Sequence, residues 1–169
     1  MSKNTRFLTH AAVIAALYAV LTHLQNVLLP GSTTWAIQMR LSEALCVLSF
    51  FTPAAIPGLT VGCLVFNITY AAALPLDFLV GSLATLLAAG GMWLTRRVTV
   101  KGYPLVGMAM PALFNALLVG WELTVYIGGG FFLNALYVAL GELAVLLTFG
   151  TVLFYAVKKR HLDTKMFGA

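Results

Sequence analysis

The sequence predicts an all-α fold, an integral membrane bundle of six transmembrane helices that forms a single domain over residues 1–169. Hydrophobic residues make up 61% of the chain and charged residues only 9%, whereas soluble domains carry about a quarter charged residues. At about 20 apolar residues per span, the length leaves room for five to seven spans and little else. The distribution of positive charge then favours six.

Positive charge is confined to three short stretches. Of the ten Lys and Arg residues, all except Arg40 precede the first predicted span, lie between the fourth and fifth, or follow the sixth: Lys3, Arg6, Arg96, Arg97, Lys101, Lys158, Lys159, Arg160 and Lys165. Six spans put all of these on one side of the membrane, which the positive-inside rule makes cytoplasmic, whereas five or seven would divide them. We therefore expect both termini in the cytoplasm. We interpret the net charge of +5 as topological and as lipid contact, not as nucleic-acid binding.

Turn-forming residues mark the ends of the spans. Pro30 and Gly31 follow the first, Thr52–Pro57 (TPAAIP) follows the second, Pro75 separates the third from the fourth, and Gly128–Gly130 separates the fifth from the sixth. Proline disfavours helix at the residue before it, and glycine clusters favour turns. The start of the chain lacks a signal-peptide cleavage pattern, so we expect its apolar stretch to be the first span. The predicted spans are 7–29, 36–51, 54–73, 76–95, 104–126 and 131–157.

Five charged residues interrupt the predicted spans, at mid-depth or nearer the outer surface: Arg40, Glu43, Asp77, Glu122 and Glu142. An ionised group facing lipid is costly, so such residues usually face a bundle interior and mark a function. Four carboxylates and one arginine sum to −3 if all are ionised. This charge suits a cationic ligand or one rich in N–H donors, because a carboxylate can accept two parallel N–H bonds. Two amides, Asn67 and Asn115, are expected at similar depth.

A purely structural explanation of these residues stays open. Arg40 and Glu43 are three residues apart, so on a helix they share a face and can pair with each other. Asp77 and Glu122 would then be hydrated at the outer interface. Glu142 fits this explanation least, because it lies about three turns inside the last span with no cation nearby in the sequence.

Two patterns concern helix packing. Pro111 lies inside the fifth predicted span, where it is expected to kink the helix, and Asn115 follows four residues later on the same face. This kink serves either packing alone or a pocket that Asn115 enters.

Small residues also recur at every fourth position of the first span, in two adjacent rows that would let another helix approach closely, within the bundle or from a partner: Ala11, Ala15, Ala19, Ala12 and Ala16.

Motifs that would indicate an enzyme are missing from the sequence. It has no G-x-x-x-x-G-K-[ST] loop for ATP, no H-E-x-x-H metal motif and no C-x-x-C pair. Cys46 and Cys63 stand alone in apolar stretches, which predicts buried free thiols. We expect no catalytic residues, no cofactor and no metal.

Several blocks of the sequence resemble one family of membrane proteins. The most specific is Ile37–Leu45 (IQMRLSEAL) followed by Phe50–Leu59 (FFTPAAIPGL). These two stretches, and three supporting blocks given below, are similar to the QueT family. This family comprises the substrate-binding S components of energy-coupling-factor (ECF) transporters for queuosine precursors. Ser49 departs from the family pattern, which has proline before FFTP. The supporting blocks are GxxxxN at Gly62–Asn67, Asp77 with GSLATLLAA at Gly81–Ala89, and GELAVL at Gly141–Leu146.

The resemblance implies a protein of the bacterial plasma membrane that binds a 7-deazaguanine, either preQ1 with its aminomethyl group or the nitrile preQ0. One carboxylate would take the N1–H and 2-amino edge of the ring and another the aminomethyl ammonium. Glu142 and Glu122 are the first candidates for these roles and Asp77 the third. The expected substrate-binding set also includes Gln38, Asn67 and Asn115 for the remaining ring edge, Arg40 and Glu43 in the polar patch, and Trp35 as a stacking residue of a closing loop.

The resemblance also implies partners. S components associate through alanine-spaced faces of their first span with a transmembrane coupling protein and two cytosolic ATPases. The expected partner interface is therefore Ala11, Ala12, Ala15, Ala16 and Ala19. An S component for a different vitamin, and a membrane interaction protein without transport activity, stay open as alternatives.

Overall fold

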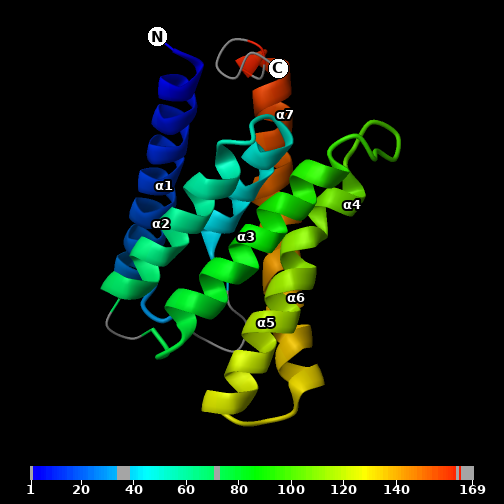
Figure 1. Ribbon diagram of the computed structural model, residues 1–169. Helices are drawn as coiled ribbons and strands as arrows, with labels where there is room; N and C mark the ends of the chain where they lie inside the picture. Colours follow the sequence, from blue (N-terminus) through cyan, green and yellow to red (C-terminus); the bar gives the residue numbers. More distant parts are fainter. Residues whose placement is uncertain (1, 34–38, 71–72, 163, 165–169) are drawn as a thin grey trace.

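The computed structural model of the protein describes residues 2–33, 39–70, 73–162 and 164. Within these residues the chain is helical and contains no strand, only an isolated bridge between Val100 and Tyr103. The elements run up and down as a bundle (Figure 1). In chain order they are α1 (Lys3–Leu28), the 3-10 helix η1 (Leu41–Phe50), α2 (Ala55–Thr69), α3 (Asp77–Thr95), α4 (Leu105–Met108), α5 (Met110–Tyr126), α6 (Phe131–Val145), the π-helical turn η2 (Leu146–Gly150) and α7 (Thr151–Lys159).

Four helical stretches of the described chain are apolar and long enough to cross a membrane. They are Lys3–Leu28, Asp77–Thr95, Leu105–Tyr126 and Phe131–Lys159. The two remaining apolar helices, η1 and α2, are shorter. All six stretches fall where a span was predicted, with ends that differ by a few residues. The second differs most, because Arg40 is extended and the helix begins only at Leu41.

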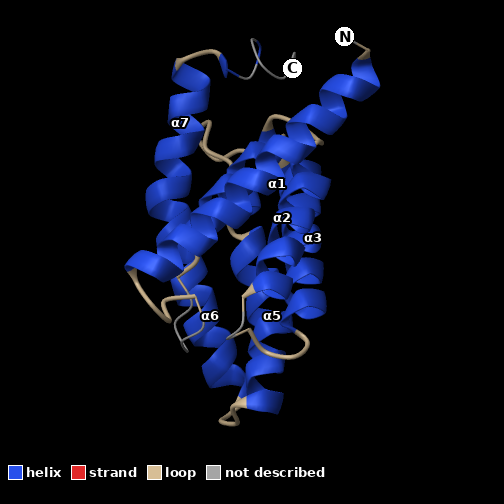
Figure 2. Ribbon diagram, turned by 90° about the vertical axis from the view of Figure 1, so that its left-hand side faces the viewer, coloured by secondary structure: helices blue, strands red, loops and turns tan. Residues whose placement is uncertain are grey.

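The short helix η1 lies inside the bundle. It contacts α1, α2, α3, α6, η2 and α7, and eight of its ten residues are buried. Around it α1 packs on α2, α2 on α3, α3 on α5 and α5 on α6, an order that Figures 1 and 2 show from two sides. A 3-10 helix rises about 2.0 Å per residue, against about 1.5 Å for an α-helix. Its ten residues therefore reach about 20 Å along the bundle.

Glycines on α2 bring α1 close. A Cβ atom added at Gly58 would lie 2.7 Å from the carbonyl oxygen of Ala11, and one at Gly62 would lie 2.7 Å from that of Ala15. Both distances are to backbone atoms, which cannot rotate away. The alanine row of α1 and the glycine pair of α2 thus form one small-residue interface inside the bundle.

The fifth predicted span is one helical stretch, Leu105–Tyr126, interrupted for one residue at Ala109. α4 ends at Met108 and α5 begins at Met110, with Pro111 in its first turn, where a missing N–H group costs little. A Cβ atom added at Gly107, just before the break, would overlap the ring of Phe50 at the end of η1. The break at Ala109 therefore lies where the buried helix η1 packs against this span.

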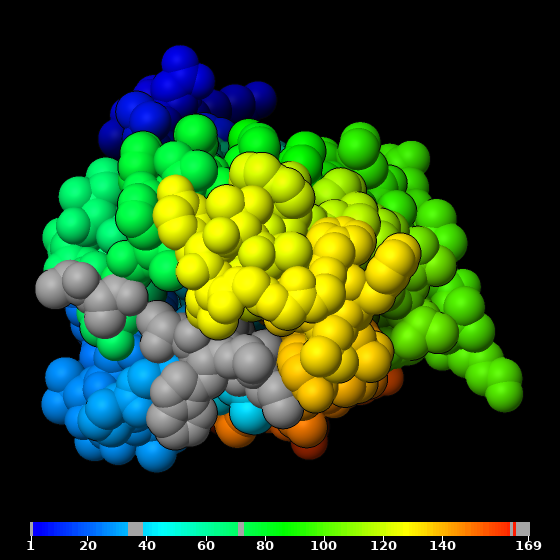
Figure 3. Space-filling view, turned by 90° about the horizontal axis from the view of Figure 1, so that it is seen from below, coloured from blue at the N-terminus to red at the C-terminus, as the bar shows by residue number. Residues whose placement is uncertain are grey.

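Both termini and the connection between α3 and α4 lie at one end of the bundle (Figures 1 and 2). The described Lys and Arg residues other than Arg40 lie in these segments, at the start of α1, after α3 and at the end of α7. Figure 3 views the opposite end, where the last turns of α1, the α2–α3 corner and the α5–α6 turn come together. In that last turn Gly128 and Gly129 adopt positive φ angles, which glycine tolerates best.

We expect Gly62→Ala to lower the melting temperature of the purified protein, because its new methyl group would push α1 away from α2 at a cost of about 1–3 kcal/mol. Gly90→Ala is the matched control: a Cβ atom there meets nothing within 4 Å, and alanine is the better helix former by about 1 kcal/mol. Thermal unfolding of both variants in detergent checks the prediction. Equal melting temperatures would contradict the close packing of α1 on α2.

Candidate functional site

The centre of the candidate site is a buried ion pair between Arg40 and Asp77. The guanidinium Nη2 of Arg40 lies 3.3 Å from Oδ2 of Asp77, and both residues are 5% exposed. Arg40 precedes η1 in an extended conformation, and Asp77 opens α3. The guanidinium also contacts α2. Its Cζ atom lies 5.7 Å from the centroid of the Phe66 ring, and its Nη1 lies 3.8 Å from Cys63 Sγ. The pair therefore ties the start of η1 to α3 over the surface of α2.

Glu43, three residues after Arg40, has different partners. Its Oε1 accepts a hydrogen bond from the hydroxyl of Tyr18 on α1, and its Oε2 accepts one from Cys46 Sγ at 3.1 Å. The predicted pairing of Arg40 with Glu43 on one helix face is wrong, because Arg40 lies outside the helix and its guanidinium reaches α3. Cys46 and Cys63 are buried free thiols, as predicted.

A row of polar side chains on α1 holds the segment that carries Arg40 and Glu43. Thr22 Oγ1 donates to Ser42 Oγ at 2.7 Å. The side-chain oxygen of Gln25 accepts from the Leu41 N–H at 2.8 Å, and its amide nitrogen donates to the Met39 carbonyl. Sequence reasoning missed this row. Its signal was the recurrence of polar residues on one helical face, at Tyr18, Thr22, Gln25 and Asn26.

Glu122 on α5 and Glu142 on α6 are the other two carboxylates of the cluster. Glu122 interacts electrostatically with Asp77 and Arg40, and Glu142 with Glu43 and Arg40. Both are buried, at 0% and 3% exposure. The alternative that Asp77 and Glu122 are hydrated at an outer interface is therefore wrong. Glu142, which has no cation nearby in the sequence, interacts electrostatically with Arg40 in the fold but forms no ion pair with it.

The two amides lie on α2 and α5, the helices that pack on either side of α3. Asn67 on α2 donates from Nδ2 to the Asp77 backbone carbonyl at 2.8 Å, so it also braces the start of α3. Asn115 on α5 is 5% exposed and lies seven residues, or two turns, before Glu122, which puts both on one face of α5. Trp35 and Gln38 lie outside the described residues.

Many polar atoms of this region have no hydrogen-bond partner among the described residues. Such atoms are costly when buried, by about 1–3 kcal/mol each and more when charged. In a protein interior they usually indicate a site that meets a ligand or water. The buried atoms are Arg40 Nε, Ser49 Oγ, Asn67 Oδ1, Asp77 Oδ1, Asn115 Nδ2, Glu122 Oε1 and Oε2, and Glu142 Oε2.

The apolar helices and the buried acidic cluster define a helical membrane protein with an internal polar site. The family model described as QueT transporter matches residues 8–159, and the chain belongs to this family. The match confirms the resemblance seen in the sequence blocks. No curated protein and no solved structure matches the chain.

We expect Tyr18→Phe to destabilise the protein, because it removes the hydroxyl that donates to the buried carboxylate of Glu43. The expected loss is about 1–3 kcal/mol, seen as a lower thermal unfolding temperature in detergent. Tyr126→Phe, at a residue 41% exposed, is the matched control and should unfold as the wild type does. A Tyr18→Phe variant as stable as this control would argue against the bond to Glu43.

Proposed function

We propose that the protein is the substrate-capture (S) subunit of an energy-coupling-factor transporter and binds a queuosine precursor, preQ1 or preQ0. The observation that carries this proposal is the match to the QueT transporter family over residues 8–159. The buried acidic cluster supports it independently, because four carboxylates and one arginine, which sum to −3 if all are ionised, suit a ligand rich in N–H donors or carrying an ammonium group. ATP hydrolysis is assigned to separate partner ATPases.

The hydrogen bonds of the cluster support specific roles for its carboxylates. Asp77 is engaged by Arg40, and Glu43 by Tyr18 and Cys46. Both carboxylate oxygens of Glu122 and one of Glu142 have no partner among the described residues. We therefore assign the ring edge and the aminomethyl ammonium to Glu122 and Glu142, with Asp77 Oδ1 as a third acceptor.

The neutral members of the proposed site serve the remaining edge of the ring. Asn67 offers Oδ1 as an acceptor, since its Nδ2 is engaged, and Asn115 offers Nδ2 as a donor. Arg40 and Glu43 act as braces that hold the cluster together. Gln38 and Trp35 keep the roles expected from the sequence, a ring contact and a stacking residue on the loop that closes over the ligand.

The proposed topology has six spans, with both termini in the cytoplasm of a bacterial cell. The gathering of the basic segments at the end that holds both termini (Figure 1) supports this orientation. The acidic cluster then lies toward the outside, since Arg40 and Asp77 follow connections at the opposite end of the bundle.

The proposed partner surface is narrower than the alanine pattern alone suggested. Ala11 and Ala15 already contact α2, and Ala19 is buried. Ala12 and Ala16 are exposed. Ala12 also lines a groove between α1 and α2, and Ala16 follows it one turn later on the same face of α1. The groove has a volume of about 270 Å³ and is lined by Phe7, Leu8, Ala11, Ala12, Ala15, Pro57, Gly58 and Val61. We assign this side to the transmembrane coupling protein.

Binding of preQ1 to the purified protein, measured by isothermal titration, tests the ligand assignment. We expect Glu142→Gln and Glu122→Gln each to weaken binding by about 2 kcal/mol, roughly thirtyfold in Kd, because each removes a desolvated charged acceptor. Asp163→Asn, which removes the one acidic residue of the C-terminal tail, is the control and should bind as the wild type does.

Three outcomes of this titration would contradict the assignment. Unchanged affinity in Glu142→Gln, with folding verified by thermal unfolding, would remove Glu142 from the site. Binding of another compound from a vitamin panel in place of preQ1 would favour an S component of different specificity. No binding by any of these compounds would favour the membrane interaction protein.

We expect Ala16→Trp to abolish ligand uptake when the protein is reconstituted with a coupling protein and its ATPases, while leaving preQ1 binding intact. The bulky ring would hold the partner helix away from α1. Ala144→Trp, at an exposed alanine of α6, is the matched control and should retain uptake. Uptake by the chain alone in liposomes would instead indicate a self-sufficient carrier.

A further inference from the structure

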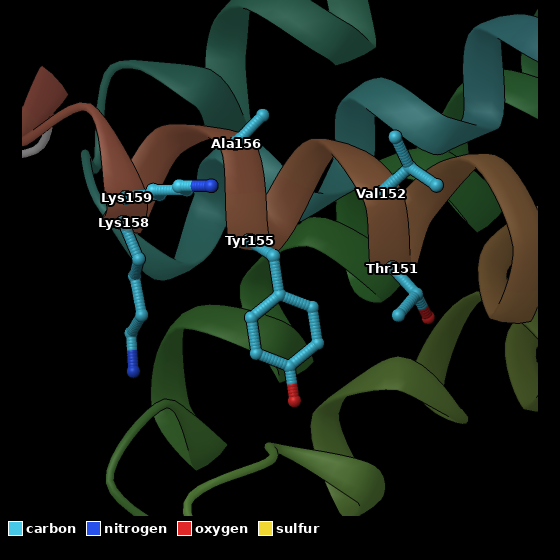
Figure 4. Close-up of a pocket in the computed structure, with 6 residues that line it drawn as sticks. All are labelled: Thr151, Val152, Tyr155, Ala156, Lys158 and Lys159. Carbon is cyan, nitrogen blue, oxygen red and sulfur yellow. The ribbon is translucent and has the colours of Figure 1, made fainter.

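A broad groove of about 700 Å³ runs along α7, at the end of the bundle that holds the termini. It lies apart from the acidic cluster, whose members sit on η1, α3, α5 and α6. Thr151, Tyr155 and Lys158 point to one side of α7, and Val152 and Ala156 to another (Figure 4). Its lining is Thr151, Val152, Tyr155, Ala156, Lys158 and Lys159.

The lining of the groove changes from apolar to positively charged along α7. Its first turns expose apolar surface, with Val152 70% and Tyr155 53% exposed. Its last turn carries Lys158 and Lys159, and the Lys158 ammonium lies 4.7 Å from the centroid of the Phe154 ring. An apolar track that ends in two ammonium groups complements a molecule with a hydrocarbon chain and an anionic head.

The aromatic wall of the groove is fixed by contacts with the α3–α4 connection. The hydroxyls of Tyr103 and Thr151 form a hydrogen bond of 2.6 Å, and the rings of Tyr103 and Tyr155 stack with their centroids 6.3 Å apart. The Tyr103 ring also meets the edge of Phe154. Lys101, two residues before Tyr103, adds a further cation to the same connection.

The protein provides these lysines with little negative charge of its own. Four of its five acidic residues are buried in the cluster around Arg40. In the described part of the chain, neither Lys158 nor Lys159 has a carboxylate within ion-pair distance. The surroundings of a membrane protein offer these lysines a counter-ion in the phosphate groups of the lipid headgroups.

We propose that the groove on α7 is a binding site for one anionic phospholipid of the leaflet that contacts the basic end of the bundle. The acyl chain lies against Val152 and Tyr155, and the phosphate accepts hydrogen bonds from Lys158 and Lys159. The proposal requires that the bundle spans a membrane, but it does not depend on the ligand assigned to the acidic cluster.

Native mass spectrometry of the delipidated full chain, titrated with phosphatidylglycerol or phosphatidylcholine, tests the proposal. We expect one phosphatidylglycerol to be retained in preference to phosphatidylcholine. Lys158→Gln/Lys159→Gln should weaken its retention roughly thirtyfold. The control Lys3→Gln/Arg97→Gln removes the same charge elsewhere at this end and should retain the lipid.

A second variant separates the groove from its charge. Ala156→Trp fills the apolar track and leaves both lysines in place, so it should also lose the lipid. Three results would overturn the proposal: equal weakening in both charge variants, equal retention of the two lipids, or full retention by Ala156→Trp. Circular dichroism and preQ1 titration of each variant verify that the bundle is intact.

Discussion

The buried guanidinium of Arg40 is the constraint on which the structure depends. A cation inside an apolar bundle has to be neutralised and hydrogen-bonded, or the fold carries an uncompensated charge that costs several kcal/mol. The partner is Asp77 on α3, and Asn67 on α2 braces the start of that helix through the Asp77 carbonyl. Tyr18, Thr22 and Gln25 of α1 fix the segment on either side of Arg40. One charge thus joins α1, η1, α2 and α3 in the first half of the chain, and the carboxylates of α5 and α6 interact with it electrostatically from the second half.

Local signals in the sequence were sufficient to predict where the helices begin and end. They were insufficient to predict which buried side chains pair with each other. Proline and glycine positions placed four of the five connections, because these residues act through their own backbone, and the basic residues placed the fifth. The partner of Arg40 could not be read this way. Glu43 is close in sequence, whereas Asp77 is close only after α2 and α3 have folded back. The sequence also could not predict that η1 is a 3-10 helix, because this winding depends on the distance along the bundle that its ten residues span.

The same limit applies to the candidate site and to the alanine rows. The sequence identified the acidic residues by their cost in a membrane, but which of them are already engaged depends on tertiary contacts, and only the fold separates Glu43 from Glu122. Alanine spacing indicated close helix packing without saying on which side. The answer lies in Gly58 and Gly62 of α2, whose spacing matches that of Ala11 and Ala15. That complementarity involves two segments more than forty residues apart in the sequence.

The winding of η1 has a geometric consequence for the buried cluster. With three residues per turn, side chains three apart are eclipsed, so Glu43, Cys46 and Ser49 form a straight file along the helix, joined at one step by the bond from Cys46 to Glu43. Rewinding the same ten residues as an α-helix would shorten the segment by about 5 Å and turn each successive member of the file by about 60°. The length of η1 and the direction of its polar side chains are therefore coupled. A change in its winding would also move Arg40, which precedes its first residue.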